Sequence, residues 1–176
     1  IRNQNVVFYL RSKKSATGKS PSEYVLEEVI KNKNLKDNRC FFIQATSPLL
    51  NETDIISAYK KYKKDKLDSL FTSYLTKKLI WKKINNTFVS LNYNYKKREM
   101  RQDHKLSHVE NGALYIFETK NLLHSKNRLH KKIGTYIMPK NRSLEIDGST
   151  DINELKIILN KKNNYKKKIL KNFKII

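Results

Sequence analysis

The sequence has few of the residues on which many catalytic and metal sites depend. Cys40 is its one cysteine, so an intrachain disulfide is impossible and a zinc site built from several thiolates is excluded. With four glycines in 176 residues, there is no glycine-rich loop to cradle a phosphate, and neither a Walker A loop nor a G-x-S-x-G elbow occurs. The four histidines lack the spacing of a zinc protease. Nucleophilic catalysis and a histidine metal centre are therefore not expected.

Long hydrophobic runs are also missing. No stretch reaches the ~18 consecutive apolar residues of a membrane-spanning helix, and no basic-then-apolar leader opens the sequence. We therefore expect a cytoplasmic protein without a membrane partner.

Positive charge is what the sequence has in excess. It contains 38 Lys and Arg against 16 Asp and Glu, a formal net charge of +22. Clustered cations bind nucleic acid, but the lysines are spread through every segment, so a nucleic-acid partner is not expected. A basic, non-catalytic module that binds nucleic acid or an acidic membrane surface remains the alternative from another class. The densest patch indicates a basic C-terminal tail over residues 161–176.

The periodicity of apolar residues predicts an α/β fold. Ser20 as N-cap, Pro21 at the first helical position and Glu23 form a predicted capping box. The run of residues 40–43 is continuous and apolar, which is typical of a buried strand in a parallel sheet. Asn85 and Asn86 lie between two short β-favouring runs and indicate a hairpin. We predict strands at 6–9, 40–43, 70–75, 113–117 and 136–138, helices at 24–32, 54–64 and 152–160, and a helix or turn at 118–124.

Two acidic residues near the end of the sequence are candidates for a metal site. In an extended segment Glu145 and Asp147 share a face about 7 Å apart, and Mg²⁺ typically takes one or two carboxylates together with phosphate oxygens. The alternative is a solvent-facing pair on an edge strand. Gln44 follows a predicted central strand, at the place where open α/β sheets bind ligands.

A basic segment precedes an Asn-Gly pair. Arg101 offers a fork of donors that matches a carboxylate or phosphate, and Asn111 before Gly112 permits a tight backbone approach. A basic loop that ends in an ordinary Asn-Gly turn would have the same sequence.

Four segments together resemble the acylneuraminate cytidylyltransferases, also called CMP-sialic acid synthetases. The segment FIQATSPL at 42–49 is similar to the family's LQPTSPL stretch, with Ala45 in place of proline. REMRQD at 98–103 with ENGALYI at 110–116 resembles RPRRQD…ENGAxYI. YIM at 136–138 with SLEID at 143–147 and Asp151 resembles YxM…SIDIDxxxD, and residues 11–22 resemble the RPxxLAxDxAxS loop.

The resemblance implies a three-layer, Rossmann-like nucleotide-diphosphosugar transferase fold with a mixed, mostly parallel sheet. It implies a cytidylyltransferase domain over residues 1–160, with a hairpin insertion at about 79–108 through which the family forms homodimers. The implied reaction joins CTP to a nine-carbon α-keto acid sugar of the sialic-acid type, with Mg²⁺, and releases pyrophosphate. Legionaminic acid, pseudaminic acid or the eight-carbon Kdo are alternative sugars.

The same resemblance implies roles for individual residues. Glu145 and Asp147 would hold the metal and act on the attacking hydroxyl, and Arg101 would join them in catalysis. The substrate-binding residues would be Gln44 for the sugar, Asn111 for sugar or phosphate, Lys82 near the triphosphate or sugar, and Arg11 and Ser22 for cytidine. Lys82 and Arg101 are candidates to act in the site of the partner subunit.

The sequence departs from the family pattern in three further ways. The family's first β-α-β portion, which carries the triphosphate loop, has no counterpart in it, so part of the triphosphate site is expected to be missing and the chain to be inactive alone. Glu145 stands where the family usually has Asp, which lengthens that ligand by one methylene. Gly18 replaces the usual Asp of the N-terminal loop.

Overall fold

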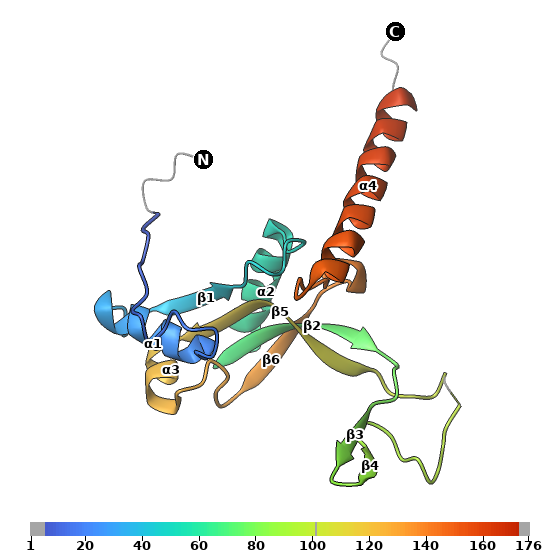
Figure 1. Cartoon of the computed structure of the whole chain (residues 1–176), viewed down its shortest axis with the longest axis horizontal. Coiled ribbons are helices and arrows are strands. Elements are labelled where there is room, and N and C mark those ends of the chain that lie inside the picture. The colour runs from blue at the N-terminus through green and yellow to red at the C-terminus, as the bar shows by residue number, and fades with distance from the viewer. Residues whose placement is uncertain (1–5, 101, 173–176) are drawn as a thin grey trace. The chain divides into compact units, whose positions relative to one another are not determined.

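The computed structural model describes residues 6–100 and 102–172, with side chains as far as Lys161. The described residues form a mixed α/β chain (Figure 1). The elements are α1 (Ser22–Asn32), β1 (Arg39–Ile43), α2 (Glu52–Lys64), β2 (Ser69–Thr76), β3 (Trp81–Ile84), β4 (Thr87–Ser90), β5 (Ser107–Glu118), α3 (Thr119–Ser125), β6 (Ile133–Ile137), the 3-10 helix η1 (Lys140–Arg142) and α4 (Ser149–Asn172). No helix that the structure describes is both long and apolar enough to cross a membrane.

The chain divides into two compact units. Unit 1 comprises Ile1–Ile43, Glu52–Thr72 and Leu114–Tyr136, and unit 2 comprises Gln44–Asn51, Ser73–Ala113 and Ile137–Ile176. Strands β2, β5 and β6 each contribute residues to both units.

The main sheet is mixed and has the strand order β1-β5-β2-β6. β1 pairs antiparallel with β5. Between β2 and β6, the Asp68 N–H donates to the Lys132 carbonyl (2.9 Å) and the Met138 N–H donates to the Ser73 carbonyl (2.7 Å). Because these bonds advance in the same direction along both segments, β2 and β6 run parallel. The expected α/β class and mixed sheet are thus confirmed.

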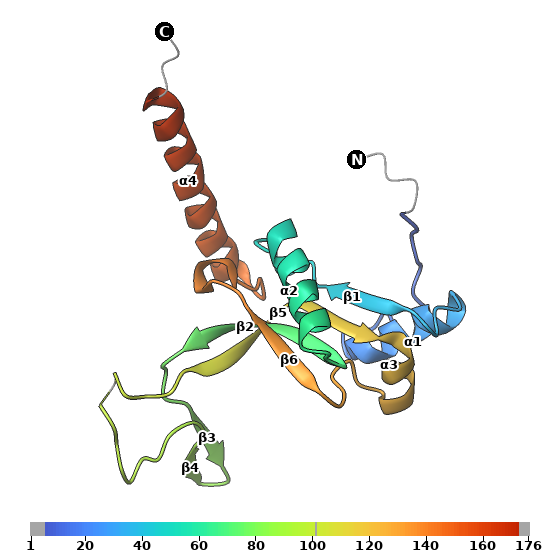
Figure 2. The ribbon, with the colours of Figure 1, turned by 180° about the vertical axis from the view of Figure 1, so that it is seen from behind.

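In unit 1, helices cover both faces of the sheet (Figures 1 and 2). Ile30 of α1 and Leu122 of α3 form one buried cluster with Tyr115 and Phe117 of β5, and Phe42 packs against it. The neighbouring Phe41 points to the other face, where its ring lies 5.4 Å from that of Tyr59 in α2. Alternate strand residues thus pack against different helices, as strand geometry requires.

Strand β1 differs from the expected buried strand of a parallel sheet. It lies at one end of the strand order and is antiparallel to its neighbour, and Phe41 and Ile43 remain 38% and 48% exposed. The apolar run therefore reflects one well-packed face and one partly open face. Cys40 lies on the packed face, and burial raises the pKa of its thiol to about 11, so the thiol is protonated at neutral pH.

Four other local predictions are also wrong. Helix α1 begins at Ser22 with Pro21 as N-cap and has no side-chain cap, so the capping box from Ser20 is not formed. Residues 6–9 form no strand, and residues 143–147 form a loop after η1 instead of an extended strand. Helix α4 does not end near residue 160 but continues to Asn172, into the expected tail.

Candidate functional site

Two loop segments and part of strand β5, all distant in sequence, meet within unit 2. The N–H of Gln44 donates to the Ala113 carbonyl (3.4 Å), and the N–H of Ile146 donates to the Thr46 carbonyl (2.9 Å). The first bond holds the segment after β1 to β5, and the second holds the 143–147 loop to that segment. We call the five residues gathered there the amide–carboxylate cluster: Gln44, Asn111, Gly112, Glu145 and Asp147.

Gly112 is the point on which this cluster converges. Its φ of +63° lies in the left-handed region, which favours glycine. A Cβ at this position would lie 2.5 Å from Oε1 of Gln44 and 2.6 Å from Oε1 of Glu145. The amide of Gln44 and the carboxylate of Glu145 therefore occupy the space that any other residue would fill. From the sequence, only the family resemblance indicated that these groups lie near one another. In the structure they do lie close together.

Asn111 is buried, with 2% of its surface exposed. Its side-chain NH₂ donates to Oγ of Ser143 (3.0 Å) and contacts the sulfur of Met138 (3.3 Å). Its Oδ1 accepts the N–H of Ala113 (3.4 Å). The side chain expected to bind sugar or phosphate is thus engaged in holding the 143–147 loop against β5, and we interpret it as a positioning residue.

Negative charge gathers at Glu145. Its pKa is raised, first by burial and then by the charges of Asp147 and Glu110. Asp147 itself is exposed, and its backbone N–H donates to the Asp151 carboxylate at the start of α4 (2.9 Å). The sequence analysis gave no site role to Glu110, although it directly precedes Asn111 in the same motif. Acidic groups this close to one another favour a cation among them.

The donor atoms of the cluster fit Mg²⁺. Within the part of the chain that the structure describes, no three His, Cys, Asp or Glu side chains are grouped so as to hold a metal ion. Mg²⁺ usually needs only one or two carboxylates, with waters and substrate phosphates completing its shell. Glu145 and Asp147 supply two hard oxygen ligands whose charges already repel one another. These two residues could therefore hold the ion.

The remaining predicted site residues come from other segments of the chain. Arg11 is exposed in a loop of unit 1, and Ser22 is the first residue of α1 in the same unit. Lys82 is exposed on β3, and among the described residues no hydrogen bond or ion pair connects it to the cluster. Arg101 lies outside the described residues.

The loop that bears Arg11 is anchored to α1 by one carboxylate. Glu28 accepts hydrogen bonds from the Tyr9 hydroxyl (2.9 Å), the Ser12 backbone N–H (2.9 Å) and the Ser12 hydroxyl (2.6 Å). The bonds from Ser12 are the largest cause that lowers the pKa of Glu28 to about 2. The loop expected to contact cytidine thus has a defined conformation.

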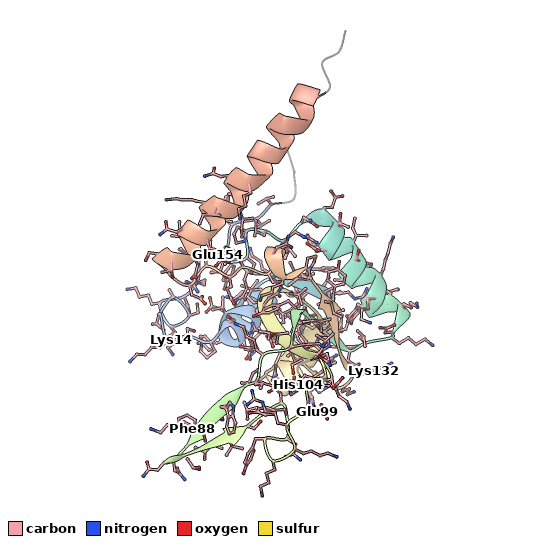
Figure 3. All side chains as sticks on the ribbon, turned by 90° about the vertical axis from the view of Figure 1, so that its right-hand side faces the viewer. Lys14, Phe88, Glu99, His104, Lys132 and Glu154 are labelled. Carbon is pink, nitrogen blue, oxygen red and sulfur yellow. The ribbon has the colours of Figure 1, made fainter. Side chains whose placement is uncertain are left out.

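The predicted hairpin is confirmed as β3 and β4, which form a two-stranded sheet. Asn85 adopts a left-handed φ of +54° at its turn, as asparagine can. Phe88 on β4 is 62% exposed. Glu99 and His104 line a hollow of about 230 Å³ in the loop that follows the hairpin (Figure 3).

Comparison with models of known protein families gave no match, and no curated protein matched the chain significantly.

Proposed function

We propose that this chain carries the sugar- and metal-binding part of a cytidylyltransferase, which joins CTP to a nine-carbon α-keto acid sugar of the sialic-acid type and releases pyrophosphate. The observation that supports this proposal most is the approach of Gln44 and Glu145 to the same face of Gly112. The motifs that resemble the family contribute these three residues from segments far apart in sequence.

The chemistry needs a positioned hydroxyl and a group that takes its proton. In the proposed reaction, the anomeric oxygen of the sugar forms a bond to the α-phosphorus of CTP, and the bond from that phosphorus to the bridging oxygen of pyrophosphate breaks. The hydroxyl proton passes to one of the two carboxylates of the cluster, Glu145 or Asp147. Gln44, with an amide donor and acceptor, holds and orients the sugar.

Glu145 and Asp147 are the proposed ligands of Mg²⁺, which would offset the negative charge of the phosphates. Asn111 keeps the 143–147 loop in place through Ser143. Arg11 and Ser22 are proposed for the cytidine, and Lys82 and Arg101 for the phosphates or sugar, in the same subunit or across a homodimer. Legionaminic, pseudaminic and Kdo sugars are the alternative substrates.

Direct sugar binding tests the proposal without requiring a complete triphosphate site. Titration calorimetry with N-acetylneuraminate, legionaminate, pseudaminate and Kdo, with Mg²⁺ present, should show binding of a nine-carbon sugar. Gln44→Ala should weaken that binding about 10-fold or more, because the sugar loses a hydrogen-bonding partner. Asn160→Ala, which removes an exposed amide from α4, should bind as the wild type does. Equal binding by Gln44→Ala and wild type, or no binding of any of the four sugars, would contradict the proposal.

A further inference from the structure

A second functional feature lies in unit 1, apart from the amide–carboxylate cluster. A hollow of about 650 Å³ is lined by residues from α2, β1, β5, α3 and two loops. We call it the basic groove and define it by Lys63, Lys66, Lys120 and Lys131 on its walls and by Arg39 and Glu118 at its base. The four lysines come from three separate segments of the chain, so their association is visible only in the folded molecule.

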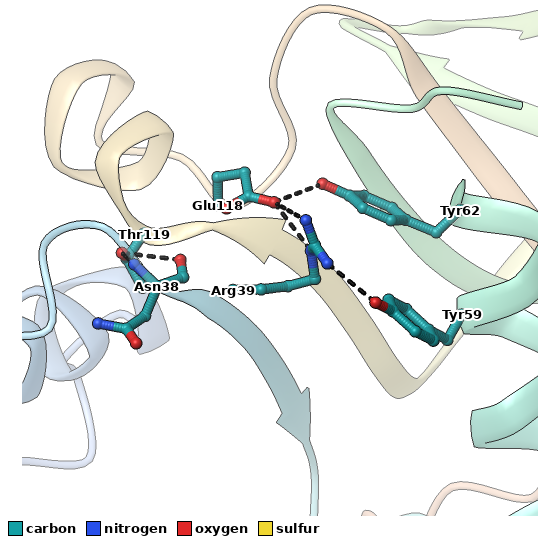
Figure 4. A network of polar contacts seen from close by, with 6 residues as sticks. All are labelled: Asn38, Arg39, Tyr59, Tyr62, Glu118 and Thr119. Carbon is teal, nitrogen blue, oxygen red and sulfur yellow. Dashed lines mark hydrogen bonds and ion pairs between the residues drawn. The ribbon is translucent and has the colours of Figure 1, made fainter. Parts of the chain in front are cut away.

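The base of the groove is a tightly bonded network (Figure 4). The Arg39 guanidinium forms an ion pair with Glu118 (2.7 Å) and donates to the Tyr59 hydroxyl (3.0 Å). The Tyr62 hydroxyl donates to the same Glu118 oxygen (3.2 Å). The base is therefore close to neutral, and its arginine is already committed to a carboxylate.

The second carboxylate of the groove is also engaged. Asp68 accepts the backbone N–H of Lys132 (3.1 Å). The four wall lysines differ from these groups, because they are exposed and no hydrogen bond or ion pair among the described residues engages their ammonium groups. Some lysines elsewhere are paired, as Lys61 is with Asp65 (2.7 Å). With five cationic and two acidic side chains on its lining, the groove has a net charge of +3.

Two of these lysines occupy backbone positions that do not suit lysine. Lys66 and Lys131 have φ values of +49° and +48°, in a region that glycine and asparagine adopt more easily. Lys66 follows the end of α2, and at the equivalent position after α1 the chain has Asn34 (φ +52°). In both places the next N–H bonds back across the helix end, from Leu67 to Tyr62 and from Leu35 to Ile30. Both lysines therefore occupy strained backbone positions, as Lys126 outside the groove also does (φ +57°).

From this arrangement we propose that the basic groove binds the phosphodiester backbone of nucleic acid, independently of base sequence. Ammonium groups act as point charges that suit phosphates without fixing a geometry. The reading of bases is not favoured, since Tyr62 is 4% exposed and offers no ring for stacking, and Arg39 is occupied by Glu118. The sequence alone spreads the lysines evenly, whereas the fold concentrates four of them here.

The salt dependence of binding provides the first test. Fluorescence anisotropy with a labelled 20-nucleotide oligothymidylate would measure affinity across a series of salt concentrations. Replacement of the four wall lysines by glutamine should weaken binding at least about 10-fold and flatten the slope of log K against log salt by about 3, since each single-strand phosphate contact contributes roughly 0.7.

A matched variant controls for total charge. It replaces four exposed lysines that do not line the groove, Lys13, Lys14, Lys36 and Lys83, with glutamine and has the same net charge as the groove variant. This control should keep nearly the wild-type affinity and slope. Equal losses in the two variants would mean that the general positive field binds the oligonucleotide, and the proposal would be wrong.

Lysine acetylation provides a second test on the unmodified protein. Mass spectrometry should show that bound oligothymidylate protects Lys63, Lys66, Lys120 and Lys131 and leaves Lys36 and Lys83 reactive. Protection by inorganic triphosphate but not by the oligonucleotide would assign the groove to a small phosphate ligand and overturn the nucleic-acid assignment. Uniform protection of all lysines would also overturn it.

Discussion

The amide–carboxylate cluster of unit 2 and the basic groove of unit 1 use polar side chains in contrasting ways. In the cluster, Gln44 and Glu145 lie so close to Gly112 that one added methyl group would collide with both. In the groove, four ammonium groups surround a hollow of about 650 Å³. The cluster depends on the position of each atom, whereas the groove depends on how many charges are present. Single substitutions should therefore have their largest effect on the cluster, whereas changes in salt concentration should have their largest effect on binding in the groove.

Removal of one charge from the cluster should have the largest effect. If the proposed function is correct, Asp147→Asn should lower Mg²⁺-dependent pyrophosphate release by about 10²-fold or more, because a metal ligand and its charge are lost. The assay requires the protein with a complete triphosphate site. The fold should be retained, as Asp147 is exposed. Asp37→Asn, an exposed acid of unit 1, is the control, and turnover of Asp147→Asn close to the wild-type rate would exclude this residue from the reaction.

A single methyl group should be the next most disruptive change. Gly112→Ala should destabilise the protein by about 1–2 kcal/mol, because alanine is strained at a φ of +63°, and should displace Gln44 and Glu145. Urea unfolding measures the first effect and sugar titration the second. Gly18→Ala is the matched control, since no atom lies within 4 Å of a Cβ placed there. The same unfolding midpoint for both variants would contradict the close packing described around Gly112.

The loop that bears Arg11 belongs to unit 1 but is held like the cluster, by bonds to one carboxylate. The pKa of Glu28 is lowered to about 2. The ionised carboxylate therefore contributes fully to the stability of the loop above the ordinary pKa of 4.5, and this contribution is lost as the pH falls from 4.5 toward 2. Hydrogen exchange at the Ser12 amide should show protection that decreases over this range. Glu28→Gln should have weak protection at every pH. Protection that stays constant from pH 5 to pH 2 would contradict the anchoring role.

The smallest expected effects come from two single substitutions in the groove, which remove the same charge but change the stability of the protein in opposite directions. Lys66→Gly should stabilise the protein by about 1 kcal/mol, since glycine accepts the left-handed backbone at the end of α2. Lys63→Gly, in the last turn of α2, should destabilise it by a similar amount. Both remove one groove lysine and should weaken oligonucleotide binding equally. Urea midpoints that shift in the same direction would show that Lys66 is not strained.

Local structure was predictable wherever apolar residues recur with a regular period. The predicted helix at 54–64 corresponds to α2 (Glu52–Lys64), and the turn at Asn85 was correctly placed between β3 and β4. Helix α4 was predicted too short, because its second half is rich in Lys and Asn and has little apolar periodicity. Helix propensity of lysine is nevertheless high, and the helix continues.

Contacts between distant segments were not predictable from periodicity. The pairing of β1 with β5 is a tertiary feature, and an apolar run alone does not distinguish it from a parallel strand. The 143–147 loop is fixed by the bond from Ile146 to Thr46, which no local pattern indicates. Glu110 was missed because its influence on Glu145 is electrostatic and depends on the fold. Local patterns singled out the residues of the cluster one by one, and only the motifs that resemble a known family indicated that they act together.

The protonated state of Cys40 has a practical consequence for spectroscopy. A thiol whose pKa is about 11 reacts slowly with maleimides at neutral pH, because the thiolate is the reactive form. A cysteine introduced at an exposed position such as Lys83 can therefore accept a dye selectively, without first removing the native thiol. Pairs of such dyes would report distances inside the otherwise unaltered chain.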